Sequence, residues 1–92
     1  MTNWHVYIVR CADGSFYTGI AKDVYRRVEE HNGNGHLGAH YTRTRRPVTL
    51  VYQEAAATQS EALRREYRIR QLGREGKELL VRGRMDADAE FK

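Results

Sequence analysis

The sequence predicts a small α/β (α+β) domain, in which helices flank a three-stranded antiparallel sheet in the order ββα(α)βα(α). Two alternating segments near the start are joined by a turn signal, which is typical of a β-hairpin. Two segments with apolar residues at helical spacing lie on either side of a third alternating segment. The chain has 92 residues, which is enough for one domain with a modest core.

The hairpin is predicted to have strands at about residues 4–10 and 15–20. Between them, Ala12-Asp13-Gly14 favours a three-residue loop with Gly14 in the left-handed conformation. Residues of one parity in each strand are apolar, so one face of the hairpin is predicted to cover the core.

The loop length sets the pairing of the two strands. A three-residue loop pairs Val9 with Tyr17 and Tyr7 with Gly19. Because successive side chains point to opposite faces of a strand, Tyr7 and Tyr17 then share one face as diagonal neighbours. Gly19 has no side chain and leaves space opposite Tyr7. A two-residue turn would instead separate the two tyrosines, and we adopt the three-residue loop.

A first helix is predicted with Asp23 as its N-cap, and it runs to about His31 before an Asn- and Gly-rich stretch at residues 32–35. Four residues form its inward stripe at helical spacing: Val24, Arg27, Val28 and His31. Arg27 and His31 are four residues apart and therefore point the same way.

The connection over residues 32–46 is glycine-rich and basic, and a short helical turn is predicted at about residues 37–41. Pro47 then opens a third strand at about residues 48–54. Its alternation predicts that three side chains share one face: Val48, Leu50 and Tyr52. This strand completes the three-stranded sheet.

Thr58 and Glu61 form a capping box that begins a second long helix, which ends at about Leu72 with Gly73 as its C-cap. The inward stripe of this helix is predicted to consist of Ala62, Leu63, Glu66 and Ile69. A final short helix is predicted at residues 77–81.

Residues 1–83 are predicted to form one domain, followed by a polar C-terminal tail over residues 84–92.

Cys11 is the only cysteine, which excludes a disulfide framework and a cysteine-rich zinc site. No apolar run reaches transmembrane length and the first residues lack a secretory h-region, so a cytoplasmic protein without a membrane partner is expected. A monomer is favoured. The formal net charge is +4, and the arginines cluster, which suits phosphate binding.

Five polar side chains are predicted to point inward, at positions where apolar residues would be expected: Tyr7, Tyr17, Arg27, His31 and Glu66. A buried charge is costly unless it is paired or used in chemistry. One interpretation is a structural ion pair between Arg27 and Glu66, capped by the tyrosines. The other interpretation is an active site, and the pattern alone does not separate the two.

The two strand triplets of the hairpin resemble the motifs that name the GIY-YIG nuclease superfamily. They read His-Val-Tyr at residues 5–7 and Tyr-Thr-Gly at residues 17–19. The likeness covers roughly residues 4–83 and is greatest to the small stand-alone bacterial members, which consist of little more than the nuclease domain. The resemblance implies the GIY-YIG fold, a nucleic-acid phosphodiester as substrate, and one divalent metal ion, Mg2+ or Mn2+.

The resemblance implies that five residues form the catalytic site: Tyr7, Tyr17, Arg27, His31 and Glu66. Glu66 is the implied metal ligand, since a hard cation prefers oxygen ligands and keeps several waters. Arg27 can stabilise negative charge on the phosphorus oxygens. Tyr7 could accept the proton of the attacking water if the metal and the arginine lower its pKa, with His31 as its helper or as the alternative base. Tyr17 is expected to position water or phosphate.

Many family members carry an asparagine after the metal-ligand helix, but this chain has none beyond Asn34. Lys77 lies where the last short helix is predicted to begin, and we expect it to contact phosphate instead. The other predicted substrate contacts lie in the hairpin and the basic loop: Gly19, His40, Tyr41, Arg43, Arg45 and Arg46. Backbone contacts from such a loop give salt-dependent, sequence-tolerant binding, whereas the alternative is a solvated loop without function.

We therefore expect a divalent-metal-dependent endonuclease that hydrolyses DNA, with RNA as an alternative substrate. Sequence specificity should be low, because the chain is predicted to have a single domain and no additional domain that could contact the bases. The expectation includes a role in DNA repair or nucleic-acid processing. The first rival is a non-catalytic nucleic-acid-binding module with the same fold, and the second is an adaptor that offers its sheet edge to a partner.

Overall fold

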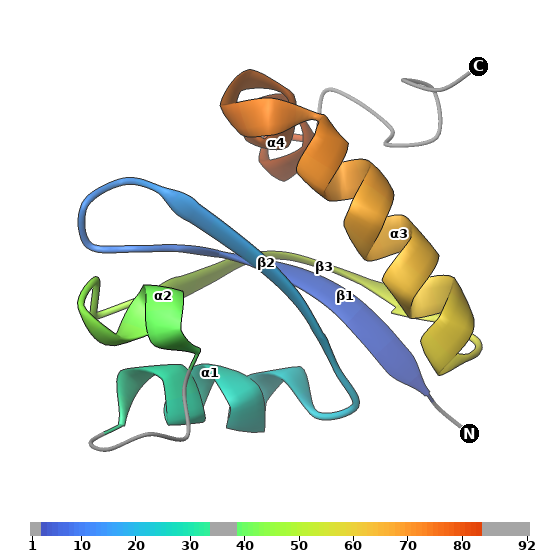
Figure 1. Ribbon diagram of the computed structural model, residues 1–92, viewed down its shortest axis with the longest axis horizontal. Helices are drawn as coiled ribbons and strands as arrows, with labels where there is room; N and C mark the ends of the chain where they lie inside the picture. Colours follow the sequence, from blue (N-terminus) through green and yellow to red (C-terminus); the bar gives the residue numbers. More distant parts are fainter. Residues whose placement is uncertain (1–2, 34–38, 84–92) are drawn as a thin grey trace.

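The computed structural model describes residues 3–33 and 39–83, so the predicted tail at residues 84–92 lies outside the described residues. Its antiparallel sheet has the order β2-β1-β3 and is built from β1 (Trp4–Arg10), β2 (Phe16–Ala21) and β3 (Thr49–Ala56). The helices are α1 (Val24–Asn32), α2 (His40–Arg43), α3 (Gln59–Gln71) and α4 (Gly73–Val81). Figure 1 shows α1 and α2 on one side of the sheet and α3 and α4 on the other. The predicted fold class is confirmed.

The hairpin has the predicted register. Tyr7 pairs with Gly19 and Val9 pairs with Tyr17, so the two tyrosines share one face of the sheet. Gly14 has a φ of 86°, which is the left-handed conformation that the three-residue loop requires.

The starts of α1 and α3 follow from local capping contacts. The Asp23 carboxylate accepts a hydrogen bond from the Arg26 backbone N–H at 3.1 Å. The Thr58 hydroxyl accepts one from the Glu61 backbone N–H, also at 3.1 Å. The capping box differs from the prediction in one contact, because the Glu61 side chain accepts from Ala57, one residue before the cap, at 3.3 Å.

The sheet buries side chains on both of its faces. The core on the side of α3 and α4 is formed by Val6, Ile8, Ala56, Ala62, Ile69 and Leu80. The core on the side of α1 is formed by Tyr7, Val9, Cys11, Val24 and Val48. Because β1 is the central strand, its residues 6–9 alternate between the two cores and are all buried. No helix in the described part of the chain is long and apolar enough to cross a membrane.

The third strand departs from its predicted alternation. A bulge shifts the pairing so that Ile8 faces Tyr52 while Val9 faces Leu50. Tyr52 therefore packs against the core on the α3 side, whereas Leu50 packs against the core on the α1 side. The predicted common face of Val48, Leu50 and Tyr52 is wrong for Tyr52, because one extra residue in a strand reverses the side to which the following residues point.

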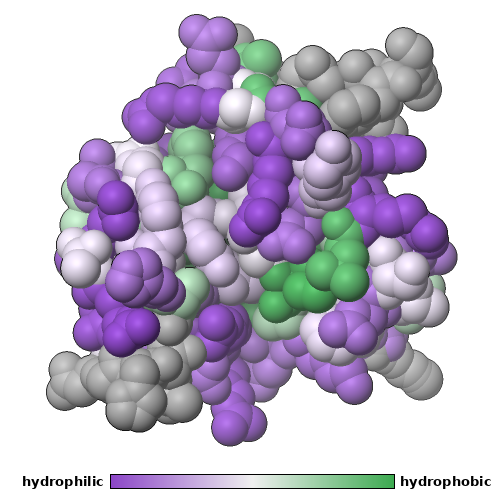
Figure 2. Space-filling model, viewed as in Figure 1, coloured by the Kyte–Doolittle hydropathy of each residue, from purple (hydrophilic) through white to green (hydrophobic). Residues whose placement is uncertain are grey.

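The helices also differ from prediction in three places. α2 begins at His40 instead of near residue 37, and residues 37 and 38 lie outside the described residues. α4 begins at Gly73, well before residue 77, so this glycine starts one helix directly after the other. Leu63 is 48% exposed, because the buried stripe of α3 is the narrower one through Ala62 and Ile69. Figure 2 shows a mainly hydrophilic face whose largest green area lies over the sheet beside α3.

Candidate active site

Tyr7 lies across Gly19 on the neighbouring strand. A β-carbon placed on Gly19 would lie 2.7 Å from Tyr7 Oη and 2.9 Å from Tyr7 Cζ, which is closer than van der Waals contact. The missing side chain lets the Tyr7 ring pass over β2, and Tyr7 is only 1% exposed. Gly19 is itself buried, and its predicted contact with substrate stays a prediction.

Tyr7 and His31 form a buried hydrogen-bonded pair. The Tyr7 hydroxyl lies 2.8 Å from His31 Nε2, and Tyr17 packs edge-on against the His31 ring with centroids 5.3 Å apart. On the other side of the ring, Nδ1 lies 2.8 Å from the hydroxyl of Thr42. That hydroxyl donates in turn to the Ala39 carbonyl at 3.0 Å. His31 and Thr42 are both fully buried, so both ring nitrogens depend on these partners.

The contacts of Thr42 favour one tautomer of His31. A hydroxyl has one proton, and in Thr42 this proton goes to the Ala39 carbonyl. Nδ1 then carries a proton that it donates to Thr42, and Nε2 is left to accept from the Tyr7 hydroxyl. The Ala39 backbone N–H donates to Nδ1 at 3.4 Å, which favours the opposite tautomer, but this contact is longer than the 2.8 Å contact between Nδ1 and Thr42. A chain of donors therefore runs from Tyr7 through His31 to Thr42.

The Tyr7–His31 pair is neutral at pH 7. Burial, and after it the neighbouring Tyr17, raises the pKa of Tyr7 to about 12. Burial, and after it the charge of Arg27, lowers the pKa of His31 to about 4. The Arg27 guanidinium lowers the pKa of Tyr7 less than the desolvation of the phenolate raises it, and a lowering by the metal and the arginine together stays a prediction. Tyr7 is thus a hydrogen-bond donor at rest.

Arg27 comes from α1 and Glu66 from α3, and the charges of both act on Tyr7. The Arg27 guanidinium hydrogen-bonds the Tyr7 hydroxyl and forms an ion pair with Glu30 at 2.8 Å. Glu66 comes from α3, close enough for its charge to act on Tyr7. The Glu66 side chain is 17% exposed and forms its ion pair with Arg70 at 3.6 Å. These ion pairs differ from the Arg27–Glu66 pair of the structural interpretation.

Glu66 fits a site for a single divalent cation. Nowhere in residues 3–33 and 39–83 do three His, Cys, Asp or Glu side chains gather into a metal cage. A hard cation can, however, be held by one carboxylate together with substrate phosphate and waters. The contact between Glu66 and Arg70 is too long for a strong hydrogen bond, so the carboxylate is not locked to a protein partner.

The predicted substrate loop is partly built into the fold. The Arg45 guanidinium lies over the Tyr41 ring, 3.9 Å from its centroid, and Tyr41 stacks on Tyr17 with centroids 5.9 Å apart. Arg46 donates to the backbone carbonyl of His31 at 2.8 Å. Arg45 and Arg46 therefore support the site as well as supplying charge near it.

The other predicted substrate residues lie at the surface or near it. His40 and Arg43 are exposed on α2. Lys77 on α4 is half-buried, and burial, followed by the charge of Arg70, lowers its pKa. Lys77 lines a small depression together with Tyr41 and Arg70.

Two features of the site were missed from the sequence. Thr42 is one: its contact with His31 joins residues 11 apart in the sequence, and no local pattern marks it. The cations Arg70 and Arg74 are the other. Arg70 is on α3 and Arg74 is on α4, so their gathering depends on how the chain turns between the two helices and not on a spacing within one helix.

Comparison with known proteins gives a consistent result. A family model described as the GIY-YIG catalytic domain matches residues 3–78. A UPF0213 protein of Staphylococcus aureus (strain Mu3) is 56% identical over 84 residues, which cover 91% of this chain and 100% of that protein. A UPF0213 protein of Desulfotalea psychrophila is 54% identical over 79 residues, which cover 86% of this chain and 71% of that protein. The solution NMR structure of a UPF0213 protein from Bacillus halodurans superposes with a TM-score of 0.54 at 46% identity, covering 87% of this chain and 83% of the other.

Proposed function

Because this chain belongs to the GIY-YIG catalytic domain family, a family of nucleases, we propose that it is an endonuclease that uses one divalent metal ion. Its proposed substrate is DNA, with RNA as the alternative, and its sequence specificity is low. The observation that carries the proposal is the buried Tyr7–His31 hydrogen bond beside Arg27 and Glu66. These groups can move a proton, bind phosphate and hold a cation, which are the three needs of phosphodiester hydrolysis.

Tyr7 and His31 take the proton of the attacking water. The Tyr7 oxygen accepts this proton while its own proton passes to His31 Nε2, 2.8 Å away. The imidazolium that results is stabilised by its hydrogen bond to Thr42. Because the pKa of Tyr7 is raised and that of His31 is lowered, the pair resists charge separation until the water attacks.

Arg27 and Tyr17 act on the phosphate and the water. The Arg27 guanidinium offers a forked donor to the phosphorus oxygens, on which negative charge grows in the transition state. Tyr17 lies edge-on against His31, and we propose that it positions water or phosphate. Glu66 would hold Mg2+ or Mn2+. When bound, such an ion stabilises negative charge on the leaving oxygen and the phosphate.

Contacts to the sugar–phosphate backbone support low specificity, since they carry no base information. We propose such contacts for His40, Tyr41, Arg43, Arg45, Arg46 and Lys77. We also propose a role in DNA repair or nucleic-acid processing, performed by a monomer in the cytoplasm. The buried free thiol of Cys11 is compatible with a reducing compartment.

Cleavage of plasmid and of single-stranded DNA and RNA tests the proposed function. The protein should produce nicked or linear plasmid with Mg2+ or Mn2+, and EDTA should stop the reaction. Tyr7→Phe is the matched control, because it keeps the ring and removes only the hydroxyl that handles the proton. The rival, a non-catalytic binding module, would retard the migration of nucleic acid without producing ends, and that outcome would contradict the proposal.

Replacing Thr42 with valine should change the tautomer of His31. Valine keeps the shape of threonine but has no hydroxyl, so Nδ1 loses its acceptor and the imidazole proton should move to Nε2. Nε2 could then no longer accept from Tyr7, and we expect cleavage to fall by about 10- to 100-fold, as for other partners that orient a functional histidine. The ¹⁵N chemical shifts of the imidazole report which nitrogen is protonated.

Thr42→Ser is the rescue variant, since it restores the hydroxyl. It should show the same Nδ1–H tautomer as the unmodified protein and most of its activity. An Nε2–H tautomer in the unmodified protein would refute the assignment. So would an unchanged tautomer in Thr42→Val.

A further inference from the structure

A small depression lies beside the site, where the junction of α3 and α4 faces Tyr41. Its volume is about 220 Å³, and three cationic side chains line it: Arg70, Arg74 and Lys77. Among the described residues that form its wall, none is acidic. Like charges repel one another when they are close together. Three cationic side chains that line one depression without an acidic residue in its wall are therefore typical of a binding site for an anion.

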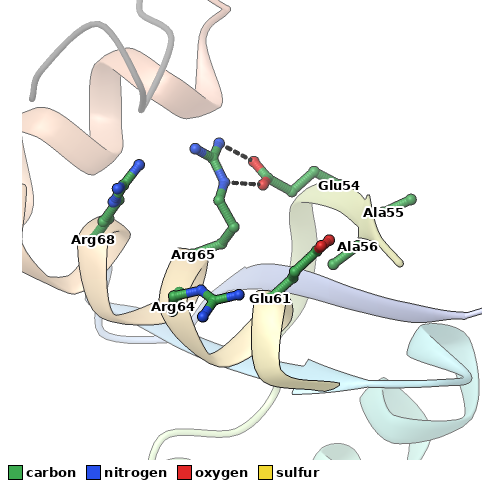
Figure 3. Close-up of a pocket in the computed structure, with 7 residues that line it drawn as sticks. All are labelled: Glu54, Ala55, Ala56, Glu61, Arg64, Arg65 and Arg68. Carbon is green, nitrogen blue, oxygen red and sulfur yellow. Dashed lines mark hydrogen bonds and ion pairs between the residues drawn. The ribbon is translucent and has the colours of Figure 1, made fainter. Parts of the chain in front are cut away.

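A larger hollow between β3 and α3 shows the opposite balance of charge (Figure 3). It measures about 470 Å³, and three arginines line it together with Glu54 and Glu61. Arg65 donates hydrogen bonds to both carboxylate oxygens of Glu54, at 2.6 and 3.0 Å. The positive charge of the hollow is therefore largely compensated within the protein.

The depression is connected to the proposed metal ligand through Arg70. This arginine lines the depression and also pairs with Glu66 at 3.6 Å, so one guanidinium separates the two. α4 begins here, at Gly73, without a side-chain cap, and the free N–H groups of a helix start favour an anion. A strand whose reacting phosphate meets Glu66 would therefore bring a neighbouring phosphate to the depression.

We infer that Arg70, Arg74 and Lys77 form a phosphate subsite for the nucleotide next to the cleaved bond. This inference rests on the proposed nuclease function and adds a requirement to it, namely a second phosphate on the cleaved strand. Arg74 is held over the Phe16 ring, 5.8 Å from its centroid, which places the guanidinium at the rim of the depression. The ammonium of Lys77 and the Arg74 guanidinium can then bind the same phosphate group.

Binding of a short fluorescein-labelled single-stranded DNA in EDTA tests the subsite without cleavage. In the variant Arg74→Gln/Lys77→Gln, affinity at low salt should fall about tenfold, the loss expected for a charged hydrogen-bonded contact. The slope of log affinity against log salt should become shallower by about 0.7, which corresponds to one phosphate contact on a single strand. Fluorescence anisotropy over a salt series measures both quantities.

Arg64→Gln/Arg68→Gln is the matched control, because it removes two positive charges from the larger hollow of Figure 3. Its salt slope should equal that of the unmodified protein. An unchanged slope in the Arg74→Gln/Lys77→Gln variant would overturn the inference, and so would an equal decrease in the control. Metal-dependent cleavage by the unmodified protein is assayed in parallel, so that absent cleavage refutes the proposed function while unchanged binding refutes the subsite alone.

Discussion

Replacing Glu66 with glutamine should abolish metal-dependent cleavage and leave the fold intact. Glutamine keeps the shape of the side chain but removes the charge that holds the cation, so we expect cleavage to fall by about 100-fold or more. Stability should change little, because the ion pair with Arg70 is long and half-exposed, and such helical pairs contribute only about 0.3–0.5 kcal/mol. Thermal melts without metal and with excess Mg2+, together with cleavage under the same conditions, measure both effects.

The structural interpretation of Glu66 predicts the reverse result. Breaking a buried ion pair costs about 3–5 kcal/mol, which would lower the melting temperature of a small domain visibly. Glu75→Gln, at an exposed carboxylate of α4, is the control for a change of net charge. Large destabilisation of Glu66→Gln together with undiminished cleavage would contradict the metal-ligand assignment and the mechanism that depends on it.

Replacing Gly19 with alanine should displace Tyr7 and cost both activity and stability. The new methyl group would lie 2.7 Å from the Tyr7 oxygen and 2.9 Å from Cζ, and the buried ring cannot move away without lengthening its 2.8 Å hydrogen bond to His31. Overpacking of this kind costs about 1–3 kcal/mol. A displacement of about 1 Å at a reacting group can reduce the rate about 100-fold. Denaturant unfolding and cleavage rates measure the two losses.

A double-mutant cycle with Tyr7→Leu identifies the cause of the Gly19→Ala effect. Leucine has no ring to meet the added methyl group, so Gly19→Ala should cost much less stability in that background. An equal cost in both backgrounds would show that the contact with Tyr7 is not responsible. The requirement for glycine would then lie in the backbone of β2.

The hairpin could be derived from the sequence because its geometry is local. The loop over residues 12–14 sets the pairing, and the two-residue period of a strand then places Tyr7 and Tyr17 on one face. The helix starts after Asp23 and Thr58 are local as well, since each cap binds an N–H three residues further on.

The third strand and the long helix were less predictable. Nothing in the alternation of β3 marks its bulge, because a bulge is defined by pairing with β1 and not by the strand alone. Leu63 and Glu66 both fitted an inward stripe on α3. Which side of the stripe meets the sheet depends on how the helix is rotated against its neighbours, and Leu63 is on the exposed side.

By itself, the sequence determined which residues of this protein can meet: the shared face of the tyrosines and the inward positions of Arg27, His31 and Glu66. Only the tertiary structure decided their partners and their protonation. The Thr42 hydroxyl meets His31 although the two residues are 11 apart in the sequence, and this contact favours the tautomer with the proton on Nδ1. The pKa of Tyr7 rises because many neighbouring residues together exclude water from its hydroxyl group. These residues come together only when the helices pack against the sheet.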